Sequence, residues 1–252
     1  MKIYNIGFLI VLMIFSSFKK EESKKQICIY TIGDSTMADK INPNENPERG
    51  WCQVLPKFLN DKVVVKNHAV NGRSTRSFID EKKWDAVYHQ LKKGDYVFIQ
   101  FGHNDQKEND PKRYTNPSTA YRNNLIKFVN ETREKGAIPV LFTSIVRRNF
   151  NEEGTLVDTH NMYPFVARSV ANEYNVSLID LQFLTEKLEE SYGVEASKKL
   201  HLHYLPNEIS YYPKGKEDDT HLSVLGATEV AKLAISSLHK NVKKFSNYIK
   251  EE

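Results

Sequence analysis

The sequence predicts an α/β fold in three layers, with a parallel sheet of five strands between two layers of helices. Compact apolar runs rich in β-branched and aromatic residues alternate with longer segments of helical periodicity. Helices between consecutive strands are the crossover connections that a parallel sheet requires, and they cover both of its faces. Because the 252 residues contain no repeat, low-complexity linker or composition break, we expect a single domain.

Five segments have the length and composition of buried strands. They are Ile27–Ile32, Val63–Lys66, Tyr96–Phe101, Ile138–Thr143 and Val176–Ile179. The predicted helices are Trp51–Leu59, Phe78–Leu91, Ser118–Lys135, Met162–Tyr174 and Ser223–His239. Gly94 and Gly136 stand where helices should end, while Asn116-Pro117 and Ser223 are typical helix starts.

The first residues are typical of a secretory signal peptide. Lys2 precedes an apolar run from Ile6 to Phe15, and a charged stretch follows at residues 19–22. That run is too short to cross a bilayer, which takes about 20 apolar residues. We therefore expect residues 1–20 to be a signal peptide and residues 26–250 to form the domain. The mature protein should be secreted or periplasmic, without stable membrane insertion.

The charge balance argues against a nucleic-acid partner. Lys and Arg number 36 against 32 Asp and Glu, a formal net charge of +4, and no basic block is interleaved with aromatic residues. A mild positive excess still favours a polyanionic substrate such as an acidic polysaccharide, because it raises the local substrate concentration.

The chain has two cysteines, Cys28 in a strand pattern and Cys52 beside Trp51. Oxidising surroundings permit a disulfide between them but do not require one. We expect two buried thiols, since free cysteine behaves as a small apolar residue.

Polar motifs follow the predicted strands at the edge where open α/β sheets bind ligands. The first strand runs into Gly33–Thr36, the second is followed by Asn71–Ser74, and the third by Gly102–Asp105. A fourth cluster, Asp218–His221, precedes the last helix. Long polar loops are predicted at His103–Asn116, Arg147–His160 and Pro206–Asp219, and loops of this length usually carry function.

These motifs contain every group that acyl transfer by a serine requires. Ser35 would attack an ester carbonyl, His221 would accept its proton, and Asp218 would hold the imidazole in the right tautomer. The backbone N–H groups of Ser35 and Gly72 and the side-chain amide of Asn104 would bind the oxyanion. Glycine suits the second position because a carbonyl oxygen can approach its backbone closely.

Each of these residues also has a structural interpretation. Ser35 could cap the following helix, Gly72 could serve a turn, and Asn104 could stabilise a loop. The placement of all three after successive strands favours the catalytic interpretation. His221 could be a structural histidine, although an aspartate three residues before it fits a catalytic role. On spacing alone, Asp219 competes with Asp218.

The four motifs resemble the four-block signature of the SGNH, or GDSL-type, hydrolases. Within that superfamily the chain resembles the rhamnogalacturonan acetylesterases, through these segments: Gly33–Ala38, Gly50-Trp51, Asn71–Ser74, Phe101–Asp105 and Asp218-x-Thr220-His221. The resemblance covers nearly the whole mature chain. It implies a flavodoxin-like sheet, removal of acetyl groups from a pectic polysaccharide, Asp218 as the orienting acid, and no metal or organic cofactor.

Two residues depart from the pattern of that family. Cys52 stands where a small residue such as glycine is expected, and Asn71 replaces a glycine that often precedes Gly72. Neither departure affects a proposed catalytic group.

Other residues give weaker indications. Arg73, Arg147 and Arg148 could pair with galacturonate carboxylates, although ordinary surface arginines are an equal alternative. His201 and His203 could supply two metal ligands, but no third ligand follows at a recognisable spacing, so we expect no metal site. Four tyrosines could form a platform for sugars, with buried or rim tyrosines as the default: Tyr114, Tyr163, Tyr204 and Tyr211.

Two other function classes and one other hydrolase fold are alternatives to a pectin acetylesterase. An esterase or lipase with the same catalytic set could act on other acyl esters, including those of acetylated xylan, but long polar loops argue against an acyl-chain pocket. A non-catalytic carbohydrate-binding module would not need Ser35, Asp218 and His221 together. An α/β-hydrolase is excluded, because the chain lacks a G-x-S-x-G motif.

Overall fold

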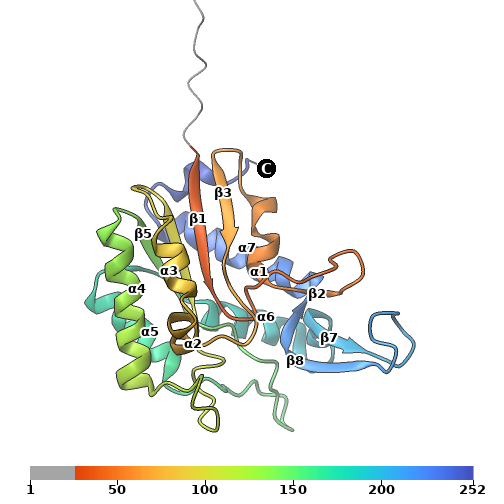
Figure 1. Cartoon of the computed structure of the whole chain (residues 1–252). Helices are drawn as coiled ribbons and strands as arrows, with labels where there is room; N and C mark the ends of the chain where they lie inside the picture. The colour runs from red at the N-terminus through yellow and green to blue at the C-terminus, as the bar shows by residue number, and fades with distance from the viewer. Residues whose placement is uncertain (1–25, 252) are drawn as a thin grey trace, which may run out of the picture.

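The computed structural model describes residues 26–251, so the predicted signal peptide lies outside the described residues. A five-stranded parallel sheet forms the centre of the fold (Figure 1). Its strand order is β3, β1, β4, β5, β6. Its strands are β1 Ile27–Gly33, β3 Val63–Asn67, β4 Tyr96–Gln100, β5 Ile138–Phe142 and β6 Ser177–Ile179. This is the flavodoxin-like strand order, and the predicted fold class is confirmed.

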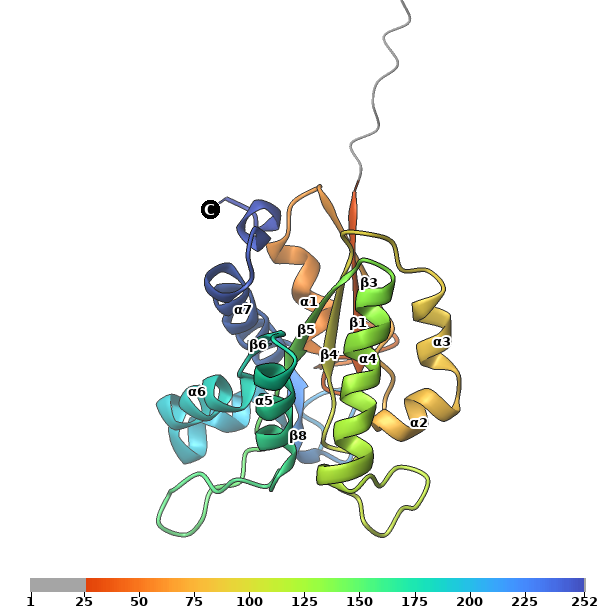
Figure 2. The same ribbon diagram turned by 90° about the vertical axis from the view of Figure 1, so that its left-hand side faces the viewer.

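Helices cover both faces of the sheet (Figure 2). Along β4, Tyr96 and Phe98 belong to one core, and Val97 and Ile99 belong to the other. The first core lies under α1 (Trp51–Val54) and α7 (Val224–Asn241). The second lies under α2 (Thr75–Asp80), α3 (Lys83–Tyr88), α4 (Arg122–Glu134) and α5 (Tyr163–Glu173). Burial on both faces explains why the strands read as almost continuous apolar runs.

The predicted helix over Phe78–Leu91 is in fact two short helices, α2 and α3. Lys82 lies between them with a φ of 57°, a left-handed conformation that interrupts the helical path. The first helix also begins earlier than predicted, because Ser74 and Ser77 form reciprocal capping hydrogen bonds at its start. The last helix was predicted correctly: the Ser223 hydroxyl caps α7 by accepting from the backbone N–H of Gly226.

Two features were not predicted from the sequence. The first is helix α6 (Leu181–Ala196), and the second is an antiparallel sheet in the order β2, β8, β7. The strands of that sheet are β2 Glu48–Arg49, β7 His201–Tyr204 and β8 Lys216–Ser223. The polar loop predicted over Pro206–Asp219 therefore ends earlier than predicted, because β8 already begins at Lys216. Single turns of helix complete the fold: η1 Leu55–Phe58, η2 Pro117–Tyr121, η3 Ser197–Leu200 and η4 Phe245–Tyr248.

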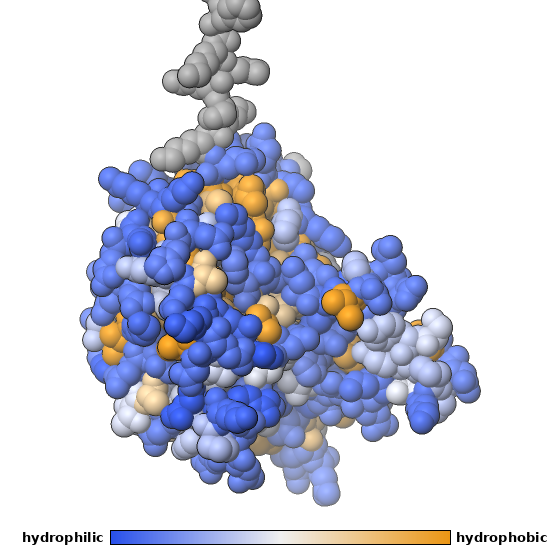
Figure 3. All heavy atoms as spheres, viewed as in Figure 1, coloured by the Kyte–Doolittle hydropathy of each residue, from blue (hydrophilic) through white to orange (hydrophobic). Residues whose placement is uncertain are grey.

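The two cysteines are free, with Cys52 buried and Cys28 partly buried. Two thiols were predicted, and only the full burial of Cys28 was wrong. Among residues 26–251, no helix has the length and apolar character that crossing a membrane requires. The face shown in Figure 3 is largely hydrophilic, with small, separate apolar patches.

Candidate active site

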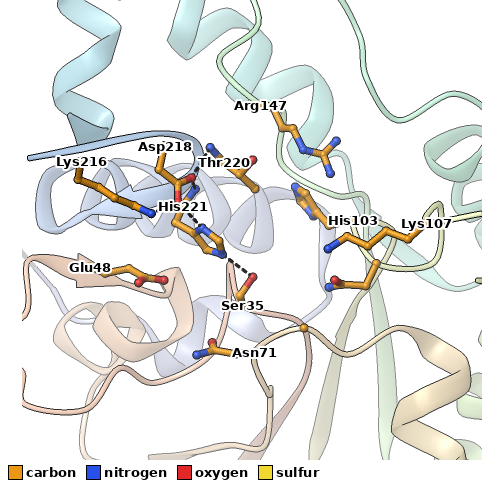
Figure 4. A pocket seen from close by; sticks show the side chains of 12 residues that line it. Ser35, Glu48, Asn71, His103, Lys107, Arg147, Lys216, Asp218, Thr220 and His221 are labelled. Carbon is orange, nitrogen blue, oxygen red and sulfur yellow. Dashed lines mark hydrogen bonds and ion pairs between the residues drawn. The ribbon is translucent and has the colours of Figure 1, made fainter. Parts of the chain in front are cut away.

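An open cavity of about 710 Å³ lies at the carboxyl edge of the parallel sheet, where β8 passes close to the end of β1 (Figure 4). It contains all five residues that the sequence predicts for acyl transfer. Its lining consists of Ser35, Glu48, Asn71, Gly72, His103, Asn104, Lys107, Arg147, Lys216, Asp218, Thr220 and His221. The loops after β1, β3 and β4 thus meet the second sheet around one space.

Three of these residues form a continuous chain of hydrogen bonds (Figure 4). The Ser35 Oγ lies 2.9 Å from His221 Nε2, and His221 Nδ1 lies 2.9 Å from Asp218 Oδ2. An ionised carboxylate only accepts hydrogen bonds, so the imidazole carries its proton on Nδ1. Nε2 is then free to accept the proton of the Ser35 hydroxyl. This arrangement can activate a serine as a nucleophile.

Asp218 also fixes the backbone of the histidine it orients. Its Oδ1 accepts hydrogen bonds from the backbone N–H groups of Thr220, at 3.0 Å, and His221, at 2.9 Å. Burial acts to raise the pKa of Asp218, but the hydrogen bonds from the ring and backbone of His221 act against it and prevail. The pKa lies well below its usual value. Asp218 therefore stays ionised and keeps accepting from the imidazole.

A β-bulge brings Asp218 and His221 together. Strand β7 pairs its consecutive residues His201 and Leu202 with Leu222 and Asp218 of β8, so three residues of β8 bulge out between these pairs. Asp219 lies in this bulge but turns away from the imidazole, with its carboxylate 2.9 Å from Arg148 and 2.8 Å from His203. Asp218, and not Asp219, therefore contacts the His221 imidazole.

A buried hydrogen-bond network holds the turn that carries Ser35. Asp34 Oδ1 accepts from the backbone N–H and the hydroxyl of Thr36, and the Thr36 hydroxyl accepts from the Gln100 amide at 2.7 Å. Gln100 in turn accepts from the Trp51 indole N–H at 2.9 Å. Gly33 lets this turn pack closely, because a Cβ there would lie 2.6 Å from the Gln100 carbonyl oxygen.

The two other predicted oxyanion donors line the same cavity. Gly72 has a φ of +76°, a conformation that favours glycine, at the turn after β3. The Asn104 side chain is buried, and its Nδ2 donates one proton to the Arg73 carbonyl oxygen at 3.2 Å. Because an amide nitrogen carries two protons, the second remains available to an oxyanion.

The loop that carries Asn104 is anchored by the neighbouring Asp105, whose carboxylate is buried. It accepts from the backbone N–H and hydroxyl of Thr75 and from the hydroxyl of Thr115. These bonds join the start of α2 to the loop after β4. The positions of Gly72 and Asn104 are thereby coupled.

His103 also lines the cavity, although no role for it is predicted from the sequence. Its Nδ1 lies 3.3 Å from Asp34 Oδ2, and its ring packs edge-on against the buried ring of His160. Burial lowers the pKa of His103 to about 4, although Asp34 acts to raise it. The imidazole is therefore uncharged at neutral pH. It lines the cavity next to Asn104 without adding a charge there.

Of the three arginines proposed for substrate binding, the structure brings only Arg147 into the cavity. Arg73 pairs with Glu81 at 3.0 Å, and Arg148 pairs with Asp219. Arg147 donates to the hydroxyl of Thr159 at 2.9 Å and has no ion-pair partner among the residues described. In Figure 4 it lies with His103 and Lys107 on one side of Ser35, and Glu48 and Lys216 lie on the other.

Glu48, Lys107 and Lys216 also line the cavity, although no sequence motif predicts them. Single charged residues in loops and short strands carry no motif, so no signal in one sequence could have found them. His201 and His203 are occupied by other partners, since His201 Nε2 lies 2.8 Å from Glu189 and His203 Nε2 lies 2.8 Å from Asp219. Within residues 26–251, no cluster of His, Cys, Asp or Glu has the composition of a metal site.

Comparison with known proteins places these motifs in a family. The model of the GDSL-like lipase/acylhydrolase family matches residues 31–228. The chain is 43% identical over 217 residues to the rhamnogalacturonan acetylesterase RhgT of Bacillus subtilis, and the match covers 86% of this chain and 91% of that protein.

Solved structures share the fold. Protein YxiM of Bacillus subtilis superposes with a TM-score of 0.71 at 25% identity, covering 85% of this chain and 56% of that one, so the chain spans little more than half of YxiM. The acetylxylan esterase Axe2 of Geobacillus stearothermophilus has a TM-score of 0.57 at 18% identity, over 85% of this chain and 96% of that one. An identity this low shows the fold alone. With the family model matching most of its length, the chain belongs to the GDSL-like lipase/acylhydrolase family.

Proposed function

We propose that this protein is a carbohydrate acetylesterase that removes acetyl groups from an acidic pectic polysaccharide of the rhamnogalacturonan type. The observation that carries the proposal is the hydrogen-bonded chain from Ser35 through His221 to Asp218 in an open, polar cavity. Its substrate class is supported by the 43% identity to an enzyme named rhamnogalacturonan acetylesterase.

In the proposed reaction, the Ser35 oxygen attacks the acetyl carbonyl carbon while His221 Nε2 accepts the hydroxyl proton. The oxyanion accepts hydrogen bonds from the backbone N–H groups of Ser35 and Gly72 and from Asn104 Nδ2. His221 then donates the proton to the sugar oxygen as the bond between this oxygen and the acetyl carbon breaks, so the sugar leaves with a free hydroxyl group and the acetyl group remains on Ser35. Water, which gives a proton to His221, attacks this ester, and His221 returns the proton to the Ser35 oxygen as its bond to the acetyl carbon breaks and acetate is released.

The Asn104→Ala variant is expected to lower kcat by roughly 100- to 1,000-fold, the usual cost of one oxyanion donor. KM should change little, because the donor acts mainly on the charge that develops in the transition state. Steady-state kinetics with p-nitrophenyl acetate measure both constants. A decrease in kcat of only a few-fold would show that Asn104 is not an oxyanion donor and has a structural role, such as its hydrogen bond to the Arg73 carbonyl oxygen.

Arg147 is the proposed contact for a substrate carboxylate. It lines the cavity without an ionic partner among the described residues, and a guanidinium can bind a carboxylate through two parallel hydrogen bonds. Lys107 lies on the same side and adds positive charge (Figure 4). A galacturonate unit next to the acetylated sugar would supply the matching carboxylate.

The Arg147→Met variant is expected to raise KM for acetylated rhamnogalacturonan by about 10-fold, since one charge-assisted contact contributes about 1.5 kcal/mol. KM for p-nitrophenyl acetate, which lacks a carboxylate, should stay unchanged. The exposed Arg133, on α4 and outside the cavity lining, provides the matched control in Arg133→Met. An equal rise of KM for both substrates would contradict a carboxylate contact.

The substrate class is tested by acetate release from a panel of esters. Acetylated rhamnogalacturonan should be hydrolysed with a higher kcat/KM than acetylated xylan or esters of long acyl chains. Preference for xylan would favour an acetylxylan esterase, the activity named for the structural neighbour Axe2. Preference for long chains would favour a lipase, which the polar cavity lining argues against.

We also propose that the domain of residues 26–250 acts outside the cytoplasm after removal of residues 1–20. The composition of the leader and the polymeric nature of the proposed substrate support export. N-terminal sequencing of the protein recovered outside the cytoplasm tests this point, and a start at Met1 would contradict it.

A further inference from the structure

A buried lysine that belongs to no motif lies directly behind the candidate active site. Lys40 is 5% exposed. Its ammonium group lies 2.7 Å from each of three oxygens: the Ser35 backbone carbonyl, the Asn71 side-chain carbonyl and a Glu48 carboxylate oxygen. An ammonium group has three protons, so each can be donated to one of these acceptors.

The three acceptors come from the three segments that must be aligned for acyl transfer. Ser35 belongs to the turn after β1 and carries the proposed nucleophile. Asn71 directly precedes Gly72, whose N–H is a proposed oxyanion donor. Glu48 belongs to β2, whose residues Glu48 and Arg49 pair with Ser223 and Leu222 of β8, directly after His221. One side chain thus connects the nucleophile, the oxyanion loop and the sheet that carries the base.

Lys40 is itself held in place from the other side. The side-chain amide of Gln53, on α1, accepts from the Lys40 backbone N–H at 3.0 Å and donates to the Lys40 carbonyl oxygen at 3.2 Å. The Lys40 backbone is therefore held against α1, which fixes the point from which its side chain reaches the three acceptors. With its backbone held in this way, Lys40 can keep the Ser35 turn and the Asn71 loop at a fixed separation.

Fold stability alone does not explain a charge at this position. Removing an ammonium group from water is costly unless it is paired and hydrogen-bonded, and a buried ion pair often contributes little net stability compared with apolar residues of similar size. Lys40 also donates to two neutral carbonyl oxygens, and both belong to the loops that surround the cavity. Precise placement of those loops accounts for the lysine better than stability does.

We propose that Lys40 is a positioning residue, which sets the separation between the Ser35 nucleophile and the oxyanion donor at Gly72. It acts through the Ser35 carbonyl and the Asn71 side chain and does not touch substrate. The inference rests on the proposed role of Ser35. It also gives a function to the Asn71 side chain, whose carbonyl oxygen accepts from Lys40, because a glycine at this position would offer no side-chain acceptor.

The Lys40→Met variant, which keeps an unbranched side chain of nearly the same length but removes the ammonium group, is expected to lower kcat for p-nitrophenyl acetate by about 10- to 100-fold. A displacement of about 1 Å in an active site can cost about 100-fold in rate. KM should remain unchanged, because Lys40 makes no substrate contact. The rate at which a fluorophosphonate labels Ser35 should fall with kcat, since this reaction also needs both the nucleophile and the oxyanion donors.

A second variant separates positioning from folding. Asn71→Leu removes one acceptor while leaving Lys40 and its ion pair with Glu48, and it should lower kcat by a smaller factor than Lys40→Met. The double variant should lose less than the product of the two single effects, because both changes remove one shared contact. If Lys40→Met does not fold, judged by circular dichroism, a wild-type kcat in Asn71→Leu would overturn the proposal.

The controls distinguish this inference from the proposed function. Lys62→Met replaces an exposed lysine outside the cavity lining and should retain wild-type kinetics. If Ser35→Ala is inactive and folded Lys40→Met keeps the wild-type kcat and labelling rate, only the role of Lys40 is wrong. If Ser35→Ala keeps full activity, the proposed function itself fails. Multiplicative effects in the double variant would show that Lys40 and Asn71 act independently and would also overturn the proposal.

Discussion

Replacing Ser35 by alanine is expected to lower kcat for acetyl esters by about 10⁴-fold or more. The alanine side chain has no oxygen, so no acetyl-enzyme can form, and only direct attack by water remains. The oxyanion donors and the binding cavity would persist, which is why some residual activity should survive. A loss of 10⁴-fold corresponds to about 5 kcal/mol of transition-state stabilisation.

This result is measured by release of p-nitrophenol and of acetate, with wild type and variant side by side. Ser118→Ala, an exposed serine at the start of η2, is a matched control and should keep wild-type activity. Circular dichroism should show the same fold in all three proteins, since the Ser35 side chain contributes only its bond to His221 among the described contacts. Comparable hydrolysis by Ser35→Ala would contradict the serine mechanism.

The Asp218→Asn variant is expected to lose about 10⁴-fold in kcat. An asparagine amide can donate to His221 Nδ1, which stabilises the tautomer with the proton on Nε2. That nitrogen then cannot accept the proton of Ser35, although the heavy atoms need hardly move. Near neutral pH the change should appear in kcat for both p-nitrophenyl acetate and acetylated polysaccharide.

The adjacent carboxylate offers a close control. Asp219→Asn makes the same change from carboxylate to amide at the next residue. The Asp219 side chain contacts Arg148 and His203 and does not contact His221. The kcat of this variant should stay within a few-fold of wild type, because a partly exposed ion pair contributes about 1 kcal/mol or less. A loss in Asp219→Asn as large as in Asp218→Asn would show that the bulge of β8 is rearranged during the reaction.

The central sheet could be predicted because its strands are buried on both faces. Strand β4 has a fully buried sequence, Tyr96–Gln100, and no surface strand would carry five such residues in succession. The antiparallel sheet could not be found in the same way. Strand β8 begins Lys-Glu-Asp-Asp and is only partly buried over most of its length, and β2 has two residues, so neither shows an apolar pattern.

The break between α2 and α3 and the whole of α6 are also absent from the predicted elements. The first depends on the left-handed backbone of Lys82, a conformation that lysine rarely adopts and that its type does not signal. The second begins after Asp180, whose carboxylate caps the helix by accepting from the Phe183 backbone N–H, and an aspartate at this position is a helix-start signal that the sequence contains.

The predicted catalytic set could be read from motifs because each member follows a strand or precedes a helix at one edge of the sheet. Ser35, Gly72 and Asn104 stand in loops whose positions the sheet determines, and the cavity contains all three. The residues around them could not be read in this way. Lys40 and Arg147 acquire their proposed roles from long-range neighbours, which a single sequence does not reveal.

The central claim is that Ser35 is the nucleophile, and covalent labelling tests it most directly. After complete inactivation by a fluorophosphonate, peptide mass spectrometry should find one label per molecule, on the Ser35 oxygen, and the loss of acetyl-ester hydrolysis should follow the labelled fraction. His221→Ala should label much more slowly, because its serine lacks the base. Full esterase activity with Ser35 labelled, or inactivation with the label on another residue, would contradict the account.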